Sequence, residues 1–346
     1  MKGYDPILTT ELLPFSPQAA QKAAEILSAG GIVGIPTETV YGLAADALNE
    51  KAVRSIFEAK GRPQDNPLIV HISGMEQLPP LVREIPPLAY KLAEKFWPGP
   101  LTMIFPKSDM IPSATSGGLD TVAVRMPQSP EARAIIDACG FPLAAPSANL
   151  SGSPSPTTAQ HVMNDMNGRI PLIIDGGECS CGVESTVLCF TGADRVRILR
   201  PGGVTPEMLS ECCGADIDPA VTAEPPKGAK VLSPGMKYKH YSPKAEVYIV
   251  NAHGEKLRRW CDKNVSGSSA VLCSDEHEHG IFHCFGKDPS EQAHRLFALL
   301  READEQGIEK VYVEMPSEQG IGLAVYNRLL RAAAFRVIET GDGDER

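Results

Sequence analysis

Two short motifs carry side chains that suit the binding of an anion. The first is Lys60-Gly61-Arg62, where a helix that begins near Glu50 is predicted to end at the glycine, and Pro63 prevents it from continuing. This corner places two cations close together on a rigid part of the chain. Basic residues in the last turn of a surface helix commonly interact only with the helix dipole, and this alternative stays open for Lys60.

The second motif is S-A-N at 147–149, which follows an apolar strand predicted at 143–145. Residues 151–158 then supply Ser, Gly and Thr before a helix at 158–166. Helix N-termini present unpaired N–H groups and the positive end of the helix dipole, so this segment suits a phosphate without any net basic charge. Ordinary capping of the helix explains the same residues equally well.

Other polar side chains stand where predicted strands begin or end, a common location for ligand-binding groups. Arg125 closes one strand, Ser185 opens another, and Arg200 closes a third. His71 interrupts the apolar run at 68–72, although a histidine in such a strand is more often a satisfied core residue than a ligand. Because the sequence has no G-x-S-x-G elbow, H-E-x-x-H helix or Walker loop, we expect chemistry by cations, hydroxyls and amides rather than by a protein nucleophile.

A large mixed α/β domain at 1–217 is predicted to position these residues. It opens with a helix at 18–29 that Ser16 caps and that Gly30-Gly31 end. The other helices are predicted at 50–60, 87–96, 130–139 and 158–166, and the strands at 32–35, 68–72, 101–105, 121–125, 143–145, 172–174, 185–190 and 196–199.

A second, smaller domain is predicted at 245–346, after a proline-rich linker or lid at 218–244. Its strands and helices alternate, as expected of a small Rossmann-like parallel sheet. The strands are predicted at 245–250, 270–272 and 311–313, and the helices at 254–262, 290–306 and 322–333. The G-x-G at 320–322 lacks the rest of the dinucleotide fingerprint, so the fold alone predicts no dinucleotide site.

The second half of the linker, 233–243, concentrates two tyrosines, a histidine and two lysines. This composition suits stacking on a base and neutralising phosphates. A structureless connection of this length is usually either a passive tether or a functional lid. We expect a lid over the open face of the first domain, with a merely solvated basic linker as the alternative.

The bulk composition describes an ordinary globular protein. A chain of 346 residues with 42% hydrophobic and 22% charged residues suits two domains. The net charge of -10 is spread along it, because residues 1–217 carry 16 Lys and Arg against 23 Asp and Glu, and residues 218–346 carry 17 against 20. Stable nucleic-acid complexes draw on cations at phosphates, so we expect no stable complex with long RNA.

The N-terminus and the cysteines bear on location. Asp5 and Pro6 stand where a signal peptide needs an apolar core, and no uncharged apolar run reaches about 18 residues, so we expect a cytoplasmic protein without membrane contact. Nine scattered cysteines predict reduced thiols rather than a disulfide framework. The C-S-C at 179–181 and the C-C at 212–213 lack the spacing of a structural zinc site.

Taken together, several motifs resemble the YrdC-like threonylcarbamoyl-AMP synthases. They are KGRPQDNPLIVHI, PTETVYGL, WPGPLTMIF, TVAVRMP, PLAAPSANLSGSPSPT, VESTVL and LRPGG. SPGMKYKHYSP and GIGLAVYNRLLRAA resemble the linker and tail of the two-domain form of that family. The resemblance implies a large YrdC-like twisted mixed-sheet domain with a concave site, followed by a small Rossmann-like parallel α/β domain.

The resemblance also implies an activity. Such enzymes convert L-threonine, bicarbonate and ATP into threonylcarbamoyl-AMP and pyrophosphate, and tRNA threonylcarbamoyl-transferase proteins then use the product to modify tRNA. We therefore expect Mg²⁺ to arrive with ATP, held through phosphate oxygens and water without dedicated protein ligands. Direct binding of tRNA is expected to be weak or absent.

Roles for individual residues follow from the matching motifs. The resemblance implies that one set holds threonine and another holds ATP. The threonine set is Thr39, His71, Arg125, Ala145 and Ser185. The ATP set is Arg62, Asn66, Thr121, Ser147, Ser155 and Arg200, with Tyr238 and His240 from the lid, while Lys60, Arg62, Ser147 and Asn149 form a catalytic tetrad that stabilises developing charge.

Two other functions compete with this interpretation. Carbamoyl transfer in metal-enzyme maturation occurs on the same fold but needs zinc-finger and acylphosphatase-like modules, which this sequence lacks. A non-enzymatic RNA-binding or ribosome-associated module is the alternative from a different class. The acidic balance of both domains counts against it.

Overall fold

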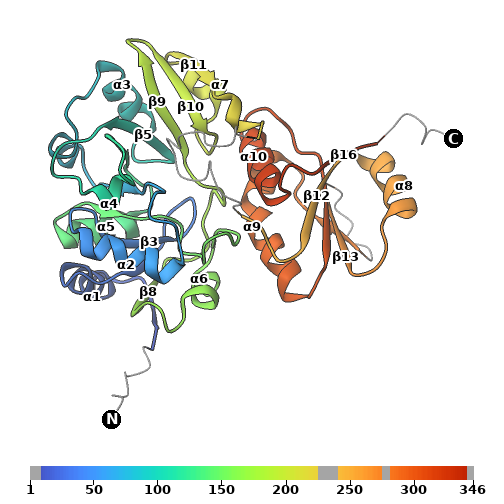
Figure 1. Cartoon of the computed structure of the whole chain (residues 1–346), viewed down its shortest axis with the longest axis horizontal. Coiled ribbons are helices and arrows are strands. Elements are labelled where there is room, and N and C mark those ends of the chain that lie inside the picture. The colour runs from blue at the N-terminus through green and yellow to red at the C-terminus, as the bar shows by residue number, and fades with distance from the viewer. Residues whose placement is uncertain (1–8, 225–240, 275–280, 341–346) are drawn as a thin grey trace.

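The computed structural model describes residues 9–224, 241–274 and 281–340. It contains two sheets, each covered by its own helices (Figure 1). The strands of the large sheet belong to residues up to Ile217, and those of the small sheet begin at Glu246. The predicted combination of a large mixed-sheet domain and a small parallel α/β domain is confirmed.

The large sheet has 11 strands and mixes parallel with antiparallel pairs. Its centre is buried on both faces, because helices and long loops cover it. In order across the sheet the strands are β1 (Glu11–Pro14), β8 (Leu172–Asp175), β2 (Val33–Ile35), β3 (Gly42–Asp46), β7 (Leu143–Ala144), β4 (Ile69–His71), β6 (Thr121–Arg125), β5 (Leu101–Pro106), β9 (Thr186–Gly192), β10 (Arg195–Arg200) and β11 (Gly214–Ile217).

The helices of the first domain begin and end at the signals that the sequence carries. Ser16 caps α1, accepting a hydrogen bond from the Ala19 amide at 3.1 Å, and Asn49 caps α2. Gly61 ends α2 with φ at 61°, a left-handed conformation that favours glycine. The helices are α1 (Pro17–Ser28), α2 (Glu50–Lys60), α3 (Pro87–Phe96), α4 (Ser113–Ser116), α5 (Pro130–Cys139), α6 (Ala159–Met166) and α7 (Pro206–Ser210), with 3₁₀ turns η1 (Met75–Gln77), η2 (Pro79–Leu81) and η3 (Pro219–Val221).

The small sheet is parallel throughout, which confirms the predicted Rossmann-like arrangement. Its helices cover both faces, with α9 and α10 on the side of the first domain and α8 on the far side (Figure 1). The strands in order are β14 (Phe282–Cys284), β13 (Ser269–Cys273), β15 (Lys310–Glu314), β12 (Glu246–Asn251) and β16 (Val337–Glu339), and the helices are α8 (Gly254–Asn264), α9 (Pro289–Glu305) and α10 (Gly322–Ala332).

Helix α10 lies between the small sheet and the first domain and is buried along its whole length. Its apolar face packs in the core of the small domain with Leu296 and Val313. Its polar face carries Asn327 and Arg331, which donate hydrogen bonds to the carbonyls of Val221 at 2.7 Å and Ala220 at 2.6 Å. Buried polar side chains need such partners, so this face fixes α10 against the start of the segment 218–244.

Strands that the sequence did not predict are β1, β3 and β11 in the large sheet and β14 and β16 in the small one. Four of them are edge strands, and an edge strand lacks the long apolar run of a central one. Strand β3 is central, but it begins with a glycine and contains two alanines, residues with low β-propensity.

Two further predictions concern membrane contact and the state of the cysteines. Within the described ranges, no helix is both long and apolar enough to cross a membrane. The expected cytoplasmic location stays a prediction. All nine cysteines are free in the structure, and five of them are buried.

Candidate functional site

A cavity of about 610 Å³, counting the open space at its mouth, lies where several strand ends of the large sheet meet. Tyr241, near the end of the segment 218–244 predicted as a linker or lid, also contributes to its wall. The polar lining consists of Thr37, Thr39, Arg62, His71, Arg125, Ser147, Glu184, Ser185, Arg200 and Tyr241. Three guanidinium groups and several hydroxyls therefore share one partly enclosed space.

Arg125 is placed at the cavity by the register of the sheet. It is the last residue of β6, which runs parallel to β4 so that Arg125 lies beside His71. Its Nη1 donates to Thr39 Oγ1 at 2.8 Å, and its Nη2 forms an ion pair with Glu38 Oε1 at 2.5 Å. Burial raises the pKa of Glu38, but the charge of Arg125 together with hydrogen bonds from backbone amides and from Arg125 outweighs burial and lowers it, so the carboxylate stays ionised.

His71 is a neutral side chain in this environment. Its ring is buried, and Nδ1 lies 3.1 Å from the carbonyl oxygen of Ile69. Burial, followed by the charge of the neighbouring Arg125, lowers the pKa of His71 to about 3. The ring therefore offers hydrogen bonds at neutral pH rather than a positive charge.

Ser185 and Arg200 form a second cationic corner of the cavity. Arg200 donates from Nε to the Ser185 carbonyl at 3.1 Å and from Nη2 to Ser185 Oγ at 3.2 Å. Gly202 allows this approach, because a Cβ there would lie 2.3 Å from the Thr186 amide nitrogen. The glycine of the L-R-P-G-G motif thus lets two strand ends pack closely at the site.

Glu184 is an acidic residue in the lining that the sequence analysis did not select. Its Oε1 accepts a hydrogen bond from Ser155 Oγ at 2.5 Å, and its Oε2 accepts one from Arg328 Nε at 2.7 Å. Burial raises the pKa of Glu184, but Arg328 and then Arg200 outweigh burial and lower it. An ionised carboxylate therefore balances part of the positive charge around the cavity.

The predicted catalytic tetrad is divided between two positions. Arg62 and Ser147 line the cavity. Lys60 is buried behind the loop, where its Nζ donates to the carbonyls of Ser147 and Asn149 at 2.5 Å each. Burial and the nearby Arg62 hold the pKa of Lys60 well below its usual value. The Lys60 ammonium thus faces the backbone of the S-A-N loop rather than the cavity.

The loop amides expected to cradle a phosphate are partly used within the protein. The Ser151 amide donates to the Lys60 carbonyl at 2.9 Å, and the Ser153 amide donates to the Leu150 carbonyl at 3.1 Å. Thr158 caps helix α6 in the ordinary way. The structure therefore favours the capping alternative for the start of this helix.

The cavity brings together eight of the residues assigned from the sequence. They are Thr39, Arg62, His71, Arg125, Ala145, Ser147, Ser185 and Arg200. Five assigned residues lie outside the lining, namely Lys60, Asn66, Thr121, Asn149 and Ser155. Tyr238 and His240 lie outside the described residues.

Two arginines of the second domain were missed by the sequence analysis. Arg328 is fully buried against Glu184, and Arg301 is buried against Asp165. The signal for Arg328 was its position next to Leu329 and Leu330 in α10, where a buried charge needs a partner. The sequence did not indicate which carboxylate would supply it.

The site offers no cluster of metal ligands in the part of the chain that the structure describes, where no three His, Cys, Asp or Glu side chains converge. The anion-binding groups are arginines and hydroxyls instead.

The fold and the cavity define a two-domain α/β protein with a buried, arginine-lined site for an anionic ligand. Residues 25–202 match the family described as "Telomere recombination" (Sua5, YciO and YrdC), and residues 204–334 match the family described as "Threonylcarbamoyl-AMP synthase, C-terminal domain". The chain belongs to the threonylcarbamoyl-AMP synthase family in its two-domain form.

Individual relatives cover nearly the whole chain. The chain is 47% identical to the threonylcarbamoyl-AMP synthase of Pyrococcus abyssi, over 92% of this chain and 94% of that protein, and 43% identical to that of Bacillus subtilis, over 96% and 97%. The structure is similar to Pyrococcus abyssi Sua5 solved with L-threonine, with a TM-score of 0.89 and 45% identity over 96% of this chain and 99% of that one. These matches favour the synthase interpretation over the RNA-binding module.

Proposed function

We propose that this protein makes threonylcarbamoyl-AMP and pyrophosphate from L-threonine, bicarbonate and ATP. Membership of the family and the arginine-lined cavity between the strand ends support the proposal. The observation that carries most weight is the convergence of Arg62, Arg125 and Arg200 on one cavity, because the reaction gathers a carboxylate, a carbamate and a triphosphate.

Threonine is proposed to bind against Arg125 and its neighbours. The Arg125 guanidinium suits the substrate carboxylate, since planar bidentate pairing is the preferred geometry of the two groups. Thr39 and neutral His71 offer hydrogen bonds to the substrate hydroxyl, and Ser185 offers one to its polar atoms. Ala145 supplies a small apolar wall that fits the threonine methyl group.

ATP is proposed to enter as its magnesium complex and to bind on the side of Arg62, Ser147 and Arg200. The magnesium ion belongs to the substrate, because its ligands are phosphate oxygens and water. Asn66, Thr121 and Ser155 are proposed to support this half from behind the lining. Tyr238 and His240 stay predicted ATP contacts.

The chemistry can proceed without a protein nucleophile. The neutral threonine amine attacks the carbon of bicarbonate, and water leaves, so the carbamate R–NH–COO⁻ forms with its atoms and charge balanced. A carbamate oxygen then attacks the α-phosphorus of ATP, the α–β bridging bond breaks, and pyrophosphate leaves. The arginines stabilise the negative charge that accumulates in this displacement, and the enclosed cavity strengthens that effect by excluding water.

Lys60 and Asn149 are proposed to act through the loop that carries Ser147. Lys60 holds two of its carbonyls at 2.5 Å, and the Asn149 side chain donates to the carbonyls of Leu150 at 2.7 Å and Ser153 at 2.9 Å. These contacts set where Ser147 Oγ faces the cavity. Both residues are therefore positioning residues in this scheme rather than groups that touch the reacting atoms.

The decisive experiment incubates the purified protein with ATP, Mg²⁺, bicarbonate and L-threonine and follows pyrophosphate release and the adenylate by mass spectrometry. We expect both products to depend on threonine and on bicarbonate. Replacing threonine by valine, which has the same shape without the hydroxyl, tests the pairing with Thr39 and His71. Equal pyrophosphate release without threonine would overturn the proposal.

The product is a mixed anhydride and hence a reactive acyl donor, so we infer that another protein consumes it by transferring the threonylcarbamoyl group to tRNA. The acidic balance of both domains supports weak or no direct tRNA binding. An electrophoretic shift assay at physiological salt tests this inference. Tight binding of tRNA by this chain alone would contradict it.

A further inference from the structure

The loop at 147–155 is anchored from two directions. From the first domain, Lys60 and the Asn149 side chain hold its backbone carbonyls, as described above. From the end of the linker and the second domain come three further contacts, each on a different residue in the second half of the loop. The first is made by the Ser242 amide, which donates to the Gly152 carbonyl at 2.9 Å.

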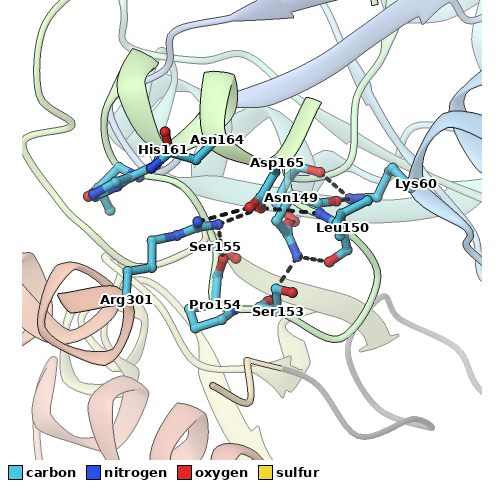
Figure 2. A network of polar contacts seen from close by, with 12 residues as sticks. Lys60, Asn149, Leu150, Ser153, Pro154, Ser155, His161, Asn164, Asp165 and Arg301 are labelled. Atoms are coloured by element: carbon cyan, nitrogen blue, oxygen red, sulfur yellow. Dashed lines mark hydrogen bonds and ion pairs between the residues drawn. The ribbon is translucent and has the colours of Figure 1, made fainter. Parts of the chain in front are cut away.

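The second contact is made by Arg301 of α9, which reaches across the domain boundary to the loop (Figure 2). Its Nη2 donates to the Pro154 carbonyl at 2.5 Å. The same guanidinium pairs with both carboxylate oxygens of Asp165, at 3.2 Å from Nη1 and 2.7 Å from Nη2. Asp165 Oδ2 also accepts the Leu150 amide at 3.3 Å, so this one ion pair fixes the loop at two places.

The third contact is made by Arg328 of α10 through Glu184. Arg328 Nε donates to Glu184 Oε2 at 2.7 Å, and Glu184 Oε1 accepts the Ser155 hydroxyl at 2.5 Å. Arg328 is fully buried and also donates to Asn327 Oδ1 at 2.7 Å. Pro154 and Ser155, which are adjacent in the chain, are thus each held by a different arginine of the second domain.

The threonine half of the cavity depends less on the second domain among the described residues, where Arg328 Nη2 donates to the Glu184 carbonyl beside Ser185 at 3.3 Å. Arg125, Thr39 and Glu38 bond to one another within the first domain. Ser185 bonds to Arg200 and to Thr102 Oγ1, the latter at 2.8 Å, also within the first domain. The two halves of the site therefore differ in how much of their support comes from the second domain.

We propose that Arg301 and Arg328 are positioning residues for the nucleotide half of the site. They act by fixing Pro154 and Ser155, and with them the course of the loop that carries Ser147. A Ser-Gly-Ser-Pro-Ser sequence has wide conformational freedom, which these buried contacts remove before the nucleotide binds. The proposal rests on the proposed function, which assigns Ser147 and Ser155 to ATP.

The test replaces Arg301 by glutamine in the full-length protein. Because a misplacement of about 1 Å can cost about a hundredfold in rate, we expect R301Q to lower kcat/KM for ATP by about tenfold to a hundredfold. The KM for threonine should stay unchanged. Arg295→Gln is the matched control, since Arg295 lies on the same helix and forms a long ion pair with Glu291 at 4.0 Å. R301K, which keeps the charge, should recover part of the loss.

Amide hydrogen exchange provides a readout that does not depend on activity. We expect faster exchange in residues 147–155 of R301Q than of the wild type, with unchanged exchange in β4 and β6. If R301Q fails to fold, D165N provides the second variant, because it removes the ionic partner and leaves Arg301 in place.

The outcomes separate this proposal from the function on which it rests. An unchanged ATP dependence together with unchanged exchange at 147–155 would overturn the proposal. A parallel loss for ATP and threonine, or exchange that rises throughout the first domain, would show a merely structural role and would also overturn it. A wild-type protein without threonine-dependent pyrophosphate release would refute the proposed function, while the exchange result would still decide whether Arg301 holds the loop.

Discussion

The two sheets use the carboxyl ends of their strands in opposite ways. In the large sheet, Arg125 at the end of β6 faces a cavity. In the small sheet, Glu314 at the end of β15 is buried against the chain itself, accepting the amides of Gly254 at 3.3 Å and Ser274 at 2.5 Å. His253 Nδ1 lies 3.1 Å from the same carboxylate.

This difference separates a ligand site from a structural one. Gly254 is the first residue of α8, and the start of a helix after a parallel strand is where nucleotide-binding α/β domains hold a phosphate. In this protein a carboxylate of the chain occupies that position. A Rossmann-like fold therefore gives the second domain no anion site at this position, and its contribution to function comes through α9 and α10.

The largest expected effect on activity is that of Arg125→Gln, at the strand ends of the large sheet that face the cavity. Truncating one partner of a buried, hydrogen-bonded charge pair between a protein and its ligand costs about 2 to 5 kcal/mol, which corresponds to a loss of about thirtyfold to several thousandfold in kcat/KM for threonine. Steady-state pyrophosphate release with varied threonine measures the effect. R125K keeps the charge but not the planar guanidinium group, so its kcat/KM for threonine should lie between those of the wild type and R125Q. Wild-type activity in R125Q would contradict the assignment of the strand ends of the large sheet to ligand binding.

Glu184→Gln should reduce stability more than any substitution at the strand ends of the small sheet, where Glu314 is buried. The substitution leaves Arg328 buried without an ionic partner, so we expect the free energy of unfolding to fall by about 3 kcal/mol. Urea unfolding followed by circular dichroism measures it. E178Q is the control, because Glu178 is half-exposed and pairs with His294 at 3.3 Å near the surface. Equal losses in the two variants would show that the Arg328 pair has no special importance.

His71 gives a pH-dependent prediction. Its pKa is about 3 in the folded protein, against 6.5 for an unperturbed histidine side chain, so the unfolded chain binds more protons between these values. Stability must then fall as pH decreases through this window, by about 1.4 kcal/mol per pH unit from this residue. H71Q should reduce the slope of the unfolding free energy between pH 6 and pH 4, measured by urea titration at about 0.5 unit intervals. An unchanged slope would mean that His71 titrates normally.

The smallest effect on activity is expected at the strand ends of the small sheet, where Glu314 is buried against the chain itself. Glu314→Gln keeps one carbonyl acceptor and loses the charge that two amides and His253 face, so we expect stability to fall by about 1 to 2 kcal/mol. Both kcat and the KM values should stay at the wild-type level, since the carboxylate lies in the second domain away from the cavity lining. A selective change in the KM for ATP would show that this edge takes part in the reaction.

Local sequence signals predicted much of the fold. Gly61 marked the end of α2, Ser16 marked the start of α1, and apolar runs located the central strands other than β3, because each signal acts over a few residues. The edge strands β1 and β16 escaped detection, since their pairing depends on neighbours that lie far away in sequence. Which elements form was therefore easier to predict than where the sheets end.

The candidate site shows the same limit. The cavity residues could be assigned because the motifs that carry them are contiguous, as with Arg125 at the end of its strand. The position of Lys60 behind the loop could not be read from its motif, because it depends on carbonyls 87 and 89 residues away. The partnership of Glu184 with Arg328 spans 144 residues and leaves no local pattern.

That separation of 144 residues also sets an order of events during synthesis. A ribosome that adds about 5 to 20 residues per second makes Glu184 about 7 to 30 seconds before Arg328. During this interval the emerging first domain holds a carboxylate whose cationic partner does not yet exist, and the loop at 147–155 lacks its outer anchors. The site is thus completed by the last quarter of the chain, so that a prematurely terminated product would carry the cavity residues without the geometry to use them.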